Sequence, residues 1–217
     1  TADYFLYDLA TKELTKILEQ AQEPTFSPDG VKIAYAKQNN LFVYDIASQN
    51  SIPVTNDGKK NSVINGITDW VYEEEFGCRD GFRWSPDSKR IAYWQVDANQ
   101  TRNYLMLNTT DSLYPFVVPV EYPKVGESPS MVRLGVVGAE GGQTTWMNIP
   151  GDPRNNYLPR MEWAANANEL IVQQLNRKQN ESRVFLCHTA DGSANLIYTE
   201  TDKAWIDIKS RWNDDDP

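Results

Sequence analysis

Residues 73–75 are three consecutive glutamates that directly follow Trp70, Val71 and Tyr72. Asp69 can act as an N-cap, so the pattern predicts a short helix over residues 69–75. Neighbouring side chains on a helix point about 100° apart, so two adjacent glutamates can approach one small cation from two sides. A primary ammonium suits such a pair, because it carries three donors and carboxylates only accept. The run predicts either an ammonium-binding site or three solvated charges on a wet helix face.

Other candidates for chemistry are weak. No G-x-S-x-G nucleophile elbow occurs in the chain, so no catalytic residue is assigned. With one histidine, His188, a zinc site of the usual kind is not expected, and we predict no metal and no cofactor. His188 follows a strand-like run and is expected to be a partly exposed residue at a strand end. Residues 214–216 are three aspartates, expected to be solvated.

Composition narrows the class of protein and of partner. The chain has 217 residues, 12% of them aromatic, and a formal net charge of −9. Nucleic acid is not expected as a partner, because phosphate binding requires a basic surface. No window approaches the ~18 consecutive apolar residues of a membrane span. The chain opens with the strand-like TADYFLYDLA, so we expect it to be a segment of a longer protein.

Three segments of the chain, residues 26–35, 84–93 and 163–172, align without gaps. In each, an aromatic residue is followed by Ile or Leu seven positions later and by Tyr or Val nine positions later. The first two contain Ser-Pro-Asp, which favours a type I turn. Each segment therefore predicts a β-hairpin, and the repetition predicts repeated sheets of the β-propeller kind. A β-sandwich also has short strands and turns, and is the alternative.

Spacing between repeats gives the domain organisation. Asp8 and Asp45 lie 37 positions apart in similar strand-like runs, close to the ~40–45 residues of one four-stranded blade. We predict an all-β partial propeller of about four blades, with a short helical arm that carries the glutamates. The predicted parts are the end of a blade (1–16), a blade (17–56), the inserted arm (57–80), a blade (81–120), a degenerate blade (121–155), a blade (156–202) and the start of another (203–217).

The segment 65–76, NGITDWVYEEEF, followed by Trp84-Ser85-Pro86-Asp87, resembles the N-terminal propeller of dipeptidyl peptidase IV and its relatives, serine peptidases of the prolyl oligopeptidase clan. The resemblance covers nearly the whole chain. It implies an eight-bladed propeller that caps an α/β-hydrolase domain, where the catalytic serine, aspartate and histidine lie. It also implies that Glu74 and Glu75 hold the free N-terminal amine of a peptide whose second residue is proline or alanine.

The resemblance and the predicted fold together imply partners and a location. A peptide with a free N-terminal amine and the hydrolase domain of the same chain are the expected partners. Part of a propeller exposes unpaired strand edges, which seek partners, so a homodimer is expected. Relatives with this motif imply an extracytoplasmic location. A non-catalytic, TolB-like propeller that binds proteins is the alternative function.

Overall fold

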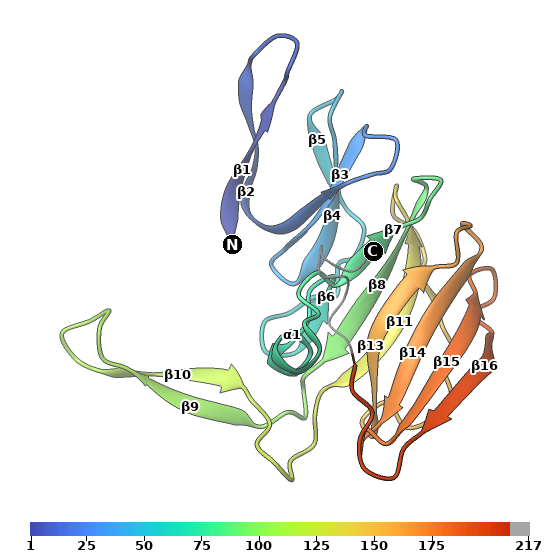
Figure 1. The fold of residues 1–217 in the computed structure, drawn as a ribbon. Helices are drawn as coiled ribbons and strands as arrows, with labels where there is room; N and C mark the ends of the chain where they lie inside the picture. Colours follow the sequence, from blue (N-terminus) through green and yellow to red (C-terminus); the bar gives the residue numbers. More distant parts are fainter. Residues whose placement is uncertain (209–217) are drawn as a thin grey trace.

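The computed structural model describes residues 1–208, whose regular secondary structure consists of antiparallel β-strands and one short helix (Figure 1). The first sheet has five strands in chain order. Its strands are β1 (Ala2–Tyr7), β2 (Leu14–Phe26), β3 (Lys32–Lys37), β4 (Asn40–Asp45) and β5 (Asn50–Pro53). The long strand β2 pairs with β1 through its first part and with β3 through its last part.

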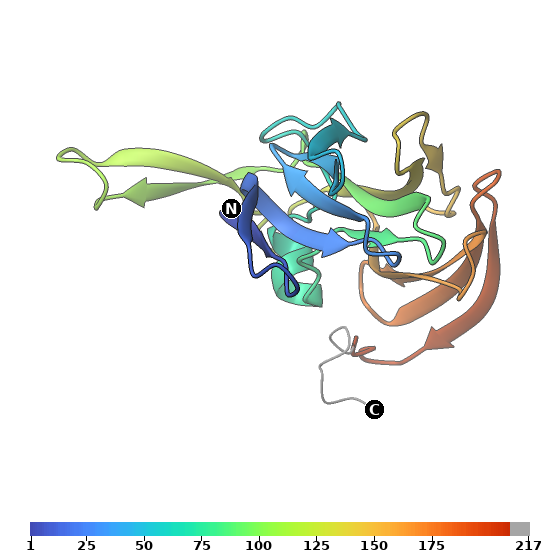
Figure 2. The ribbon, with the colours of Figure 1, turned by 90° about the horizontal axis from the view of Figure 1, so that it is seen from above.

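The second sheet is built around β8, and its strand order is β12-β11-β8-β6, with β7 also paired to β8. Its strands are β6 (Val63–Asn65), β7 (Phe82–Trp84), β8 (Arg90–Asp97), β11 (Met131–Gly138) and β12 (Thr145–Trp146). Between β8 and β11, the strands β9 (Asn103–Asn108) and β10 (Phe116–Glu121) form a separate hairpin. Figures 1 and 2 show this hairpin projecting away from the sheets.

The third sheet has four strands in chain order: β13 (Asn156–Trp163), β14 (Glu169–Asn176), β15 (Glu181–His188) and β16 (Ala194–Thr201). The three sheets pack face to face, because one buried cluster joins the first and second sheets and another joins the second and third. Successive residues of a strand face opposite ways. On β8, accordingly, Tyr93 packs into the cluster with the first sheet and Trp94 into the cluster with the third.

The sequence repeats correspond to hairpins at equivalent places in the three sheets. The seven-residue offset is a cross-strand pair in each: Phe26 with Ile33, Trp84 with Ile91, and Trp163 with Leu170. The Ile and Leu members are almost completely buried. Three sheets that follow one another along the chain confirm the predicted all-β partial propeller and do not fit a two-sheet sandwich.

The predicted division of residues 81–155 into two blades is wrong. Strand β8, from the first predicted blade, pairs along its whole length with β11, from the second, so the two predicted blades share one sheet. The 79 positions between Trp84 and Trp163 suggested an extra blade, but the hairpin β9–β10 accounts for the excess length. The predicted blade start at 203–217 has no strand in residues 203–208, and residues 209–217 lie outside the described part.

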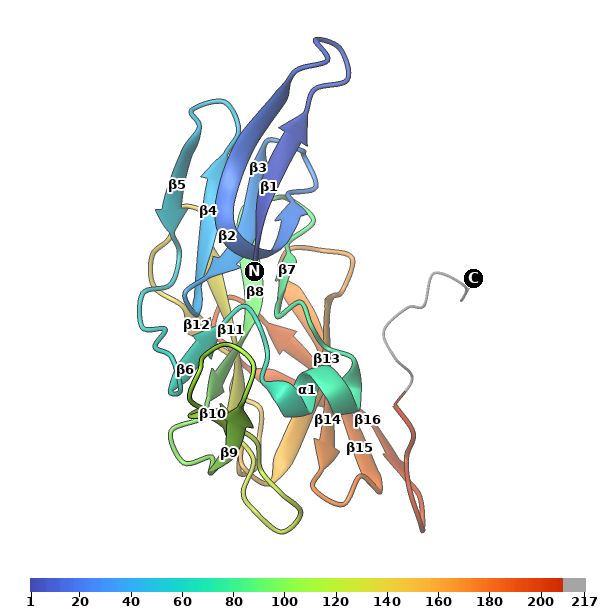
Figure 3. The same cartoon turned by 90° about the vertical axis from the view of Figure 1, so that its left-hand side faces the viewer.

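The helical arm interrupts the strand that lines one side of β8. Strand β6 pairs with β8 near Val96 and β7 pairs with it near Ala92, and the arm leaves between them. Gly66 and Gly81 close its base, because Gly81 N–H donates to Gly66 O at 3.1 Å. Gly66 N–H donates to Trp94 O, and Trp94 N–H donates to Gly81 O. The arm therefore begins within the predicted range 57–80, after β6, and Figure 3 shows its helix α1 beside the third sheet.

Among residues 1–208, no helix has the length and apolar character needed to cross a membrane.

The base of the arm yields a test of packing. Gly66 and Gly30 both have φ of +74°, which a side chain rarely adopts. A Cβ at Gly66 would lie 2.2 Å from Leu41 Cδ2, whereas a Cβ at Gly30 would meet nothing within 4 Å. Gly30→Ala should lower the free energy of unfolding by about 1–2 kcal/mol through backbone strain. Gly66→Ala should lower it by roughly 1–3 kcal/mol more through overpacking. Equal losses in urea denaturation would show that Leu41 does not restrict this turn.

Candidate functional site

The helix α1 (Trp70–Phe76) forms where the sequence predicts it, because both of its ends are capped. Asp69 is the N-cap, and its carboxylate accepts from the Tyr72 N–H at 3.1 Å. Gly77 ends the helix in the left-handed conformation, at φ 59°. Burial raises the pKa of Asp69, although hydrogen bonds from Ser130 and from Tyr72 N–H act in the opposite direction. The predicted helix and its predicted N-cap are confirmed.

One face of α1 is fastened to the third sheet through a single peptide group. The Tyr72 hydroxyl accepts from Leu158 N–H at 2.9 Å. Trp94 Nε1–H donates to Leu158 O at 2.8 Å. Tyr72 and Leu158 are both buried, and the pairing of β13 with β14 shifts register between Tyr157 and Arg160. The regular pairing of β13 with β14 is thus interrupted at Leu158, whose N–H and carbonyl oxygen hydrogen-bond to α1 and β8 instead.

Two further contacts hold the end of α1. Arg160 Nη1 donates to Phe76 O at 2.8 Å, which provides a donor for a carbonyl in the last turn. The rings of Tyr72, Phe76 and Tyr157 pack together with centroids 5.1–6.4 Å apart. Burial strongly raises the pKa of Tyr72, so its phenol stays protonated over the working pH range. The helix is therefore a fixed element rather than a free loop.

The three glutamates are all exposed but are not equivalent. Glu73 pairs with Arg79, with Oε1 3.4 Å from Nε. Glu74 and Glu75 form no ion pair with any residue of the described part. Glu75 also lines a cavity of about 410 Å³, together with Phe76, Tyr157 and others. Two of the three adjacent carboxylates are thus available to a positively charged ligand.

The outer face of α1 contacts the base of the hairpin β9–β10. The rings of Trp70 and Tyr122 lie 4.3 Å apart between centroids, and those of Tyr104 and Tyr122 lie 5.7 Å apart. Lys124 Nζ lies 5.5 Å from the Tyr104 ring centroid. Trp70 therefore links the helix to Tyr122, some fifty residues later in the chain.

The remaining candidates do not gather into a site. His188 is the last residue of β15 and is partly exposed, as predicted, and its Nδ1 lies 3.5 Å from Glu169 Oε1. Within residues 1–208, no group of three or more His, Cys, Asp or Glu side chains could hold a metal ion. The aspartates at 214–216 lie outside the described residues.

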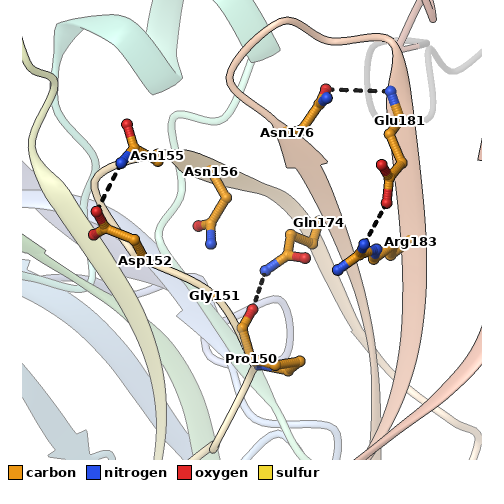
Figure 4. Close-up of a pocket in the computed structure, with 9 residues that line it drawn as sticks. All are labelled: Pro150, Gly151, Asp152, Asn155, Asn156, Gln174, Asn176, Glu181 and Arg183. Carbon is orange, nitrogen blue, oxygen red and sulfur yellow. Dashed lines mark hydrogen bonds and ion pairs between the residues drawn. The ribbon is translucent and has the colours of Figure 1, made fainter.

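A smaller polar cavity of about 150 Å³ lies between the third sheet and residues 150–152 (Figure 4). Its polar groups largely satisfy one another. Glu181 pairs with Arg183 at 2.5 Å, and Gln174 donates to Pro150 O at 2.8 Å. We assign it no ligand.

Sequence reasoning found the glutamates and the cap but missed the residues that fix them. Tyr72, Arg160 and Tyr122 act through partners more than forty positions away, and nothing in the local pattern indicates which strand those partners belong to. The apolar run before the glutamates was the available signal, because it showed that one face of the helix must be buried.

The fastening of α1 can be tested by removing one oxygen atom. Tyr72→Phe leaves the buried Leu158 N–H without its acceptor and should lower the free energy of unfolding by about 1–3 kcal/mol. The Tyr157 ring is also buried, but within residues 1–208 its hydroxyl makes no hydrogen bond. Tyr157→Phe is therefore the matched control and should cost less. Equal effects in urea denaturation would contradict a special role for the Tyr72 hydroxyl.

The sequence of this chain is similar to a known protein family and to several of its members. Residues 1–213 match the family model described as the dipeptidyl peptidase IV (DPP IV) N-terminal region. The chain is 30% identical over 216 residues to inactive dipeptidyl peptidase 10 of Mus musculus, and 33% identical over 196 residues to dipeptidyl peptidase 4 of Felis catus. These matches cover 95% and 84% of the chain, but only 27% and 26% of the relatives.

A solved structure shares the fold. The crystal structure of Porphyromonas gingivalis dipeptidyl peptidase 4 superimposes with a TM-score of 0.87 at 35% identity. The match covers 94% of this chain and 29% of that protein. The chain spans little more than a quarter of the relatives it matches. Because the family model extends over nearly all of the chain, this protein belongs to the family of the dipeptidyl peptidase IV N-terminal region.

Proposed function

We propose that Glu74 and Glu75 bind the N-terminal ammonium of a peptide substrate, and that this chain supplies substrate recognition to a dipeptidyl peptidase. The observation that carries the proposal is the difference among the three glutamates. Glu73 is neutralised by Arg79, while Glu74 and Glu75 are exposed, adjacent and in no ion pair with a described residue. Charge-assisted hydrogen bonds from an ammonium to two carboxylates are of the strong kind.

A fixed helix is what such a clamp requires. A group that positions a substrate must itself be held, because small misplacements cost rate. Tyr72 and Arg160 hold α1 to the third sheet, so the backbone that carries Glu74 and Glu75 keeps its place when the ligand binds. With the amine fixed, the peptide bond after the second residue is presented at a set distance. The preferred second residues are proline and alanine, as the family resemblance implies.

The chemistry is assigned to a part of the protein outside this chain. The proposed reaction is acyl transfer to water by a serine nucleophile in a C-terminal α/β-hydrolase domain. The chain contains no G-x-S-x-G motif, so we propose that on its own it is not catalytic. An extracytoplasmic location, as implied by the family, belongs to the same proposal.

A second function is favoured by one of the relatives. Dipeptidyl peptidase 10 of Mus musculus is named as inactive, although it matches 95% of this chain. The same recognition segment can therefore belong to a protein without activity. On this reading the propeller is a binding module, like the TolB-like alternative, and the glutamates hold a ligand that is never cleaved.

We also propose a homodimer formed through the hairpin β9–β10. The hairpin is a two-stranded sheet of its own, so each strand has an open edge, and edges of this kind pair with other chains. Both of its faces expose large apolar side chains, among them Leu105, Leu107 and Phe116. A second copy offers the same open edge and the same apolar side chains, which suits a two-fold symmetric contact.

Replacement of single glutamates tests the clamp in a full-length protein that carries this segment. Each of Glu74→Gln and Glu75→Gln removes one charge with little change of shape. A hydrogen bond to a charged group contributes roughly 1.5–3 kcal/mol, so each change should lower kcat/KM about 10–150-fold on a Gly-Pro substrate. Glu73→Gln is the matched control and should have little effect, because this side chain already pairs with Arg79.

The acetylated substrate separates recognition from chemistry. Acetyl-Gly-Pro has no ammonium, so it should be poor for the unchanged protein and no worse for the double variant. Small and equal effects at all three glutamates would show that they are only solvated charges on the helix and would contradict the proposed ammonium site. If no peptide is cleaved at all, binding of a Gly-Pro peptide should still depend on Glu74 and Glu75, as the second function requires.

The proposed dimer can be tested by charging the hairpin. Leu105 and Leu107 are 65% and 63% exposed and lie on one face of β9. Leu105→Lys with Leu107→Lys should convert a dimer to a monomer at ~μM concentration, because like charges would meet at the contact. Leu9→Lys, at a residue 85% exposed in the β1–β2 turn, is the control and should leave the dimer intact. A dimer that survives the double substitution in analytical ultracentrifugation would place the contact elsewhere.

A further inference from the structure

A row of polar side chains crosses three strands of the second sheet. Asn65 on β6 lies opposite Gln95 on β8, and Gln95 lies opposite Arg133 on β11. Asn65 is completely buried and Gln95 is 4% exposed. Buried polar side chains destabilise a fold unless they are hydrogen-bonded. The hydrogen-bond partners of Asn65 and Gln95 therefore show what this row of side chains does.

The two buried amides hold two charges at the surface. Asn65 Nδ2 donates to Asp57 Oδ1 at 2.8 Å, and Gln95 Nε2 donates to Asp57 Oδ2 at 2.9 Å. Arg133 donates to Gln95 Oε1 from both Nε and Nη2, at 2.8 and 2.6 Å. One carboxamide thus orients a carboxylate on one side and a guanidinium on the other.

Arg133 is also held by a cation–π contact with Trp146. Its guanidinium carbon lies 3.6 Å from the centroid of the Trp146 ring, and the Tyr93 ring contacts Trp146 from the side. The Tyr93 hydroxyl lies 3.0 Å from Thr144 Oγ1. Trp146 itself lies opposite Gly135, where a Cβ would come within 2.8 Å of the indole. A glycine on β11 therefore makes room for the ring on which the arginine rests.

These groups surround an open cavity of about 410 Å³ between the first and second sheets. Asp57, Arg133, Trp146 and Thr144 line it, together with Pro53 and Gln143. Its volume falls in the range of ligand sites, roughly 300–1,000 Å³. Asp57 and Arg133 are both exposed and neither forms an ion pair with a residue of the described part. This differs from the cavity of Figure 4, where Glu181 and Arg183 pair with each other.

We propose that this cavity binds a free α-amino acid as a zwitterion. Asp57 accepts hydrogen bonds from the ammonium, because each of its oxygens keeps a lone pair beyond the bond from the buried amide. Arg133 donates to the carboxylate with the N–H groups that Gln95 leaves available. The Gln95 carboxamide lies between the Asp57 carboxylate and the Arg133 guanidinium. This separation suits an α-amino acid, whose ammonium and carboxylate are joined through one carbon. The ligand's side chain lies toward Pro53 and Trp146.

The site is independent of the glutamate clamp. It lies on the face of the second sheet that meets the first sheet, whereas α1 packs against the third. A failure of this proposal would leave the function proposed for Glu74 and Glu75 untouched, and the reverse also holds.

The test compares three ligands by isothermal titration calorimetry on a full-length protein that carries this segment. Leucine has both charges, N-acetylleucine lacks the ammonium, and leucine amide lacks the carboxylate. Leucine should bind in a saturable manner, and each of the other two should bind at least about tenfold more weakly, since each loses charge-assisted hydrogen bonds. Because the three ligands meet the same unchanged protein, this comparison does not depend on how any variant folds.

Variants then assign the two charges. Arg133→Gln should weaken leucine at least about tenfold and leave leucine amide unchanged, while Asp57→Asn should weaken leucine and leave N-acetylleucine unchanged. Arg102→Gln is the matched control, because Arg102 is exposed, pairs with Glu127 and lies outside the cavity. Absence of saturable leucine binding, equal binding of the three ligands, or equal effects of Arg102→Gln and Arg133→Gln would overturn the proposal.

Discussion

The arm that carries the glutamates leaves the second sheet and returns to it at a single hydrogen-bonded closure. Gly81 N–H donates to Gly66 O, and both glycines bond to the backbone of Trp94 on β8. A Cβ on Gly81 would lie 2.7 Å from the backbone between Gly66 and Ile67, so a side chain does not fit there. The arm is short and tied at its base, and its helix must therefore pack beside the strand that it interrupts.

This constraint makes the third sheet part of the site. The apolar face of α1 packs into the cluster shared by the second and third sheets, and β13 contributes Tyr157, Leu158 and Met161 to it. The Leu158 peptide serves both elements, since Tyr72 accepts from its N–H and Trp94 donates to its oxygen. An unpaired backbone group in this core would be costly. The register shift in β13 therefore places a hydrogen-bonding peptide where the helix needs one.

The two proposed binding sites share a physical principle. In each, hydrogen-bonding groups that are buried or half-buried hold an element that carries charges exposed to solvent, and within residues 1–208 these charges form no ion pair. Tyr72 and Arg160 do this for the helix that bears Glu74 and Glu75. Asn65 and Gln95 do it for Asp57 and Arg133. Exposed ion pairs contribute little to stability, so unpaired surface charges cost the fold little and remain available to a ligand.

Sequence alone determined the local structure and the family. The Phe26–Ile33, Trp84–Ile91 and Trp163–Leu170 offsets are cross-strand pairs, and a hairpin is a local structure whose pairs can be read from spacing. The helix over Trp70–Phe76 was predictable for the same reason, because Asp69 caps it through a contact three residues away. The motif that includes the glutamates identified the dipeptidyl peptidase IV family, and the match to residues 1–213 confirms it.

Tertiary structure decided what depends on distant partners. Spacing could not distinguish an extra blade from a projecting hairpin, because both lengthen the chain between repeats. The pairing of β8 with β11 shows that the extra length is a hairpin. The three glutamates look alike in sequence, and only the fold shows that Glu73 meets Arg79. The row of Asn65, Gln95 and Arg133 was not predicted either, since its members come from three strands. A side chain's partners across a sheet follow from strand register, and over long separations that register is fixed by packing in the whole fold rather than by local sequence.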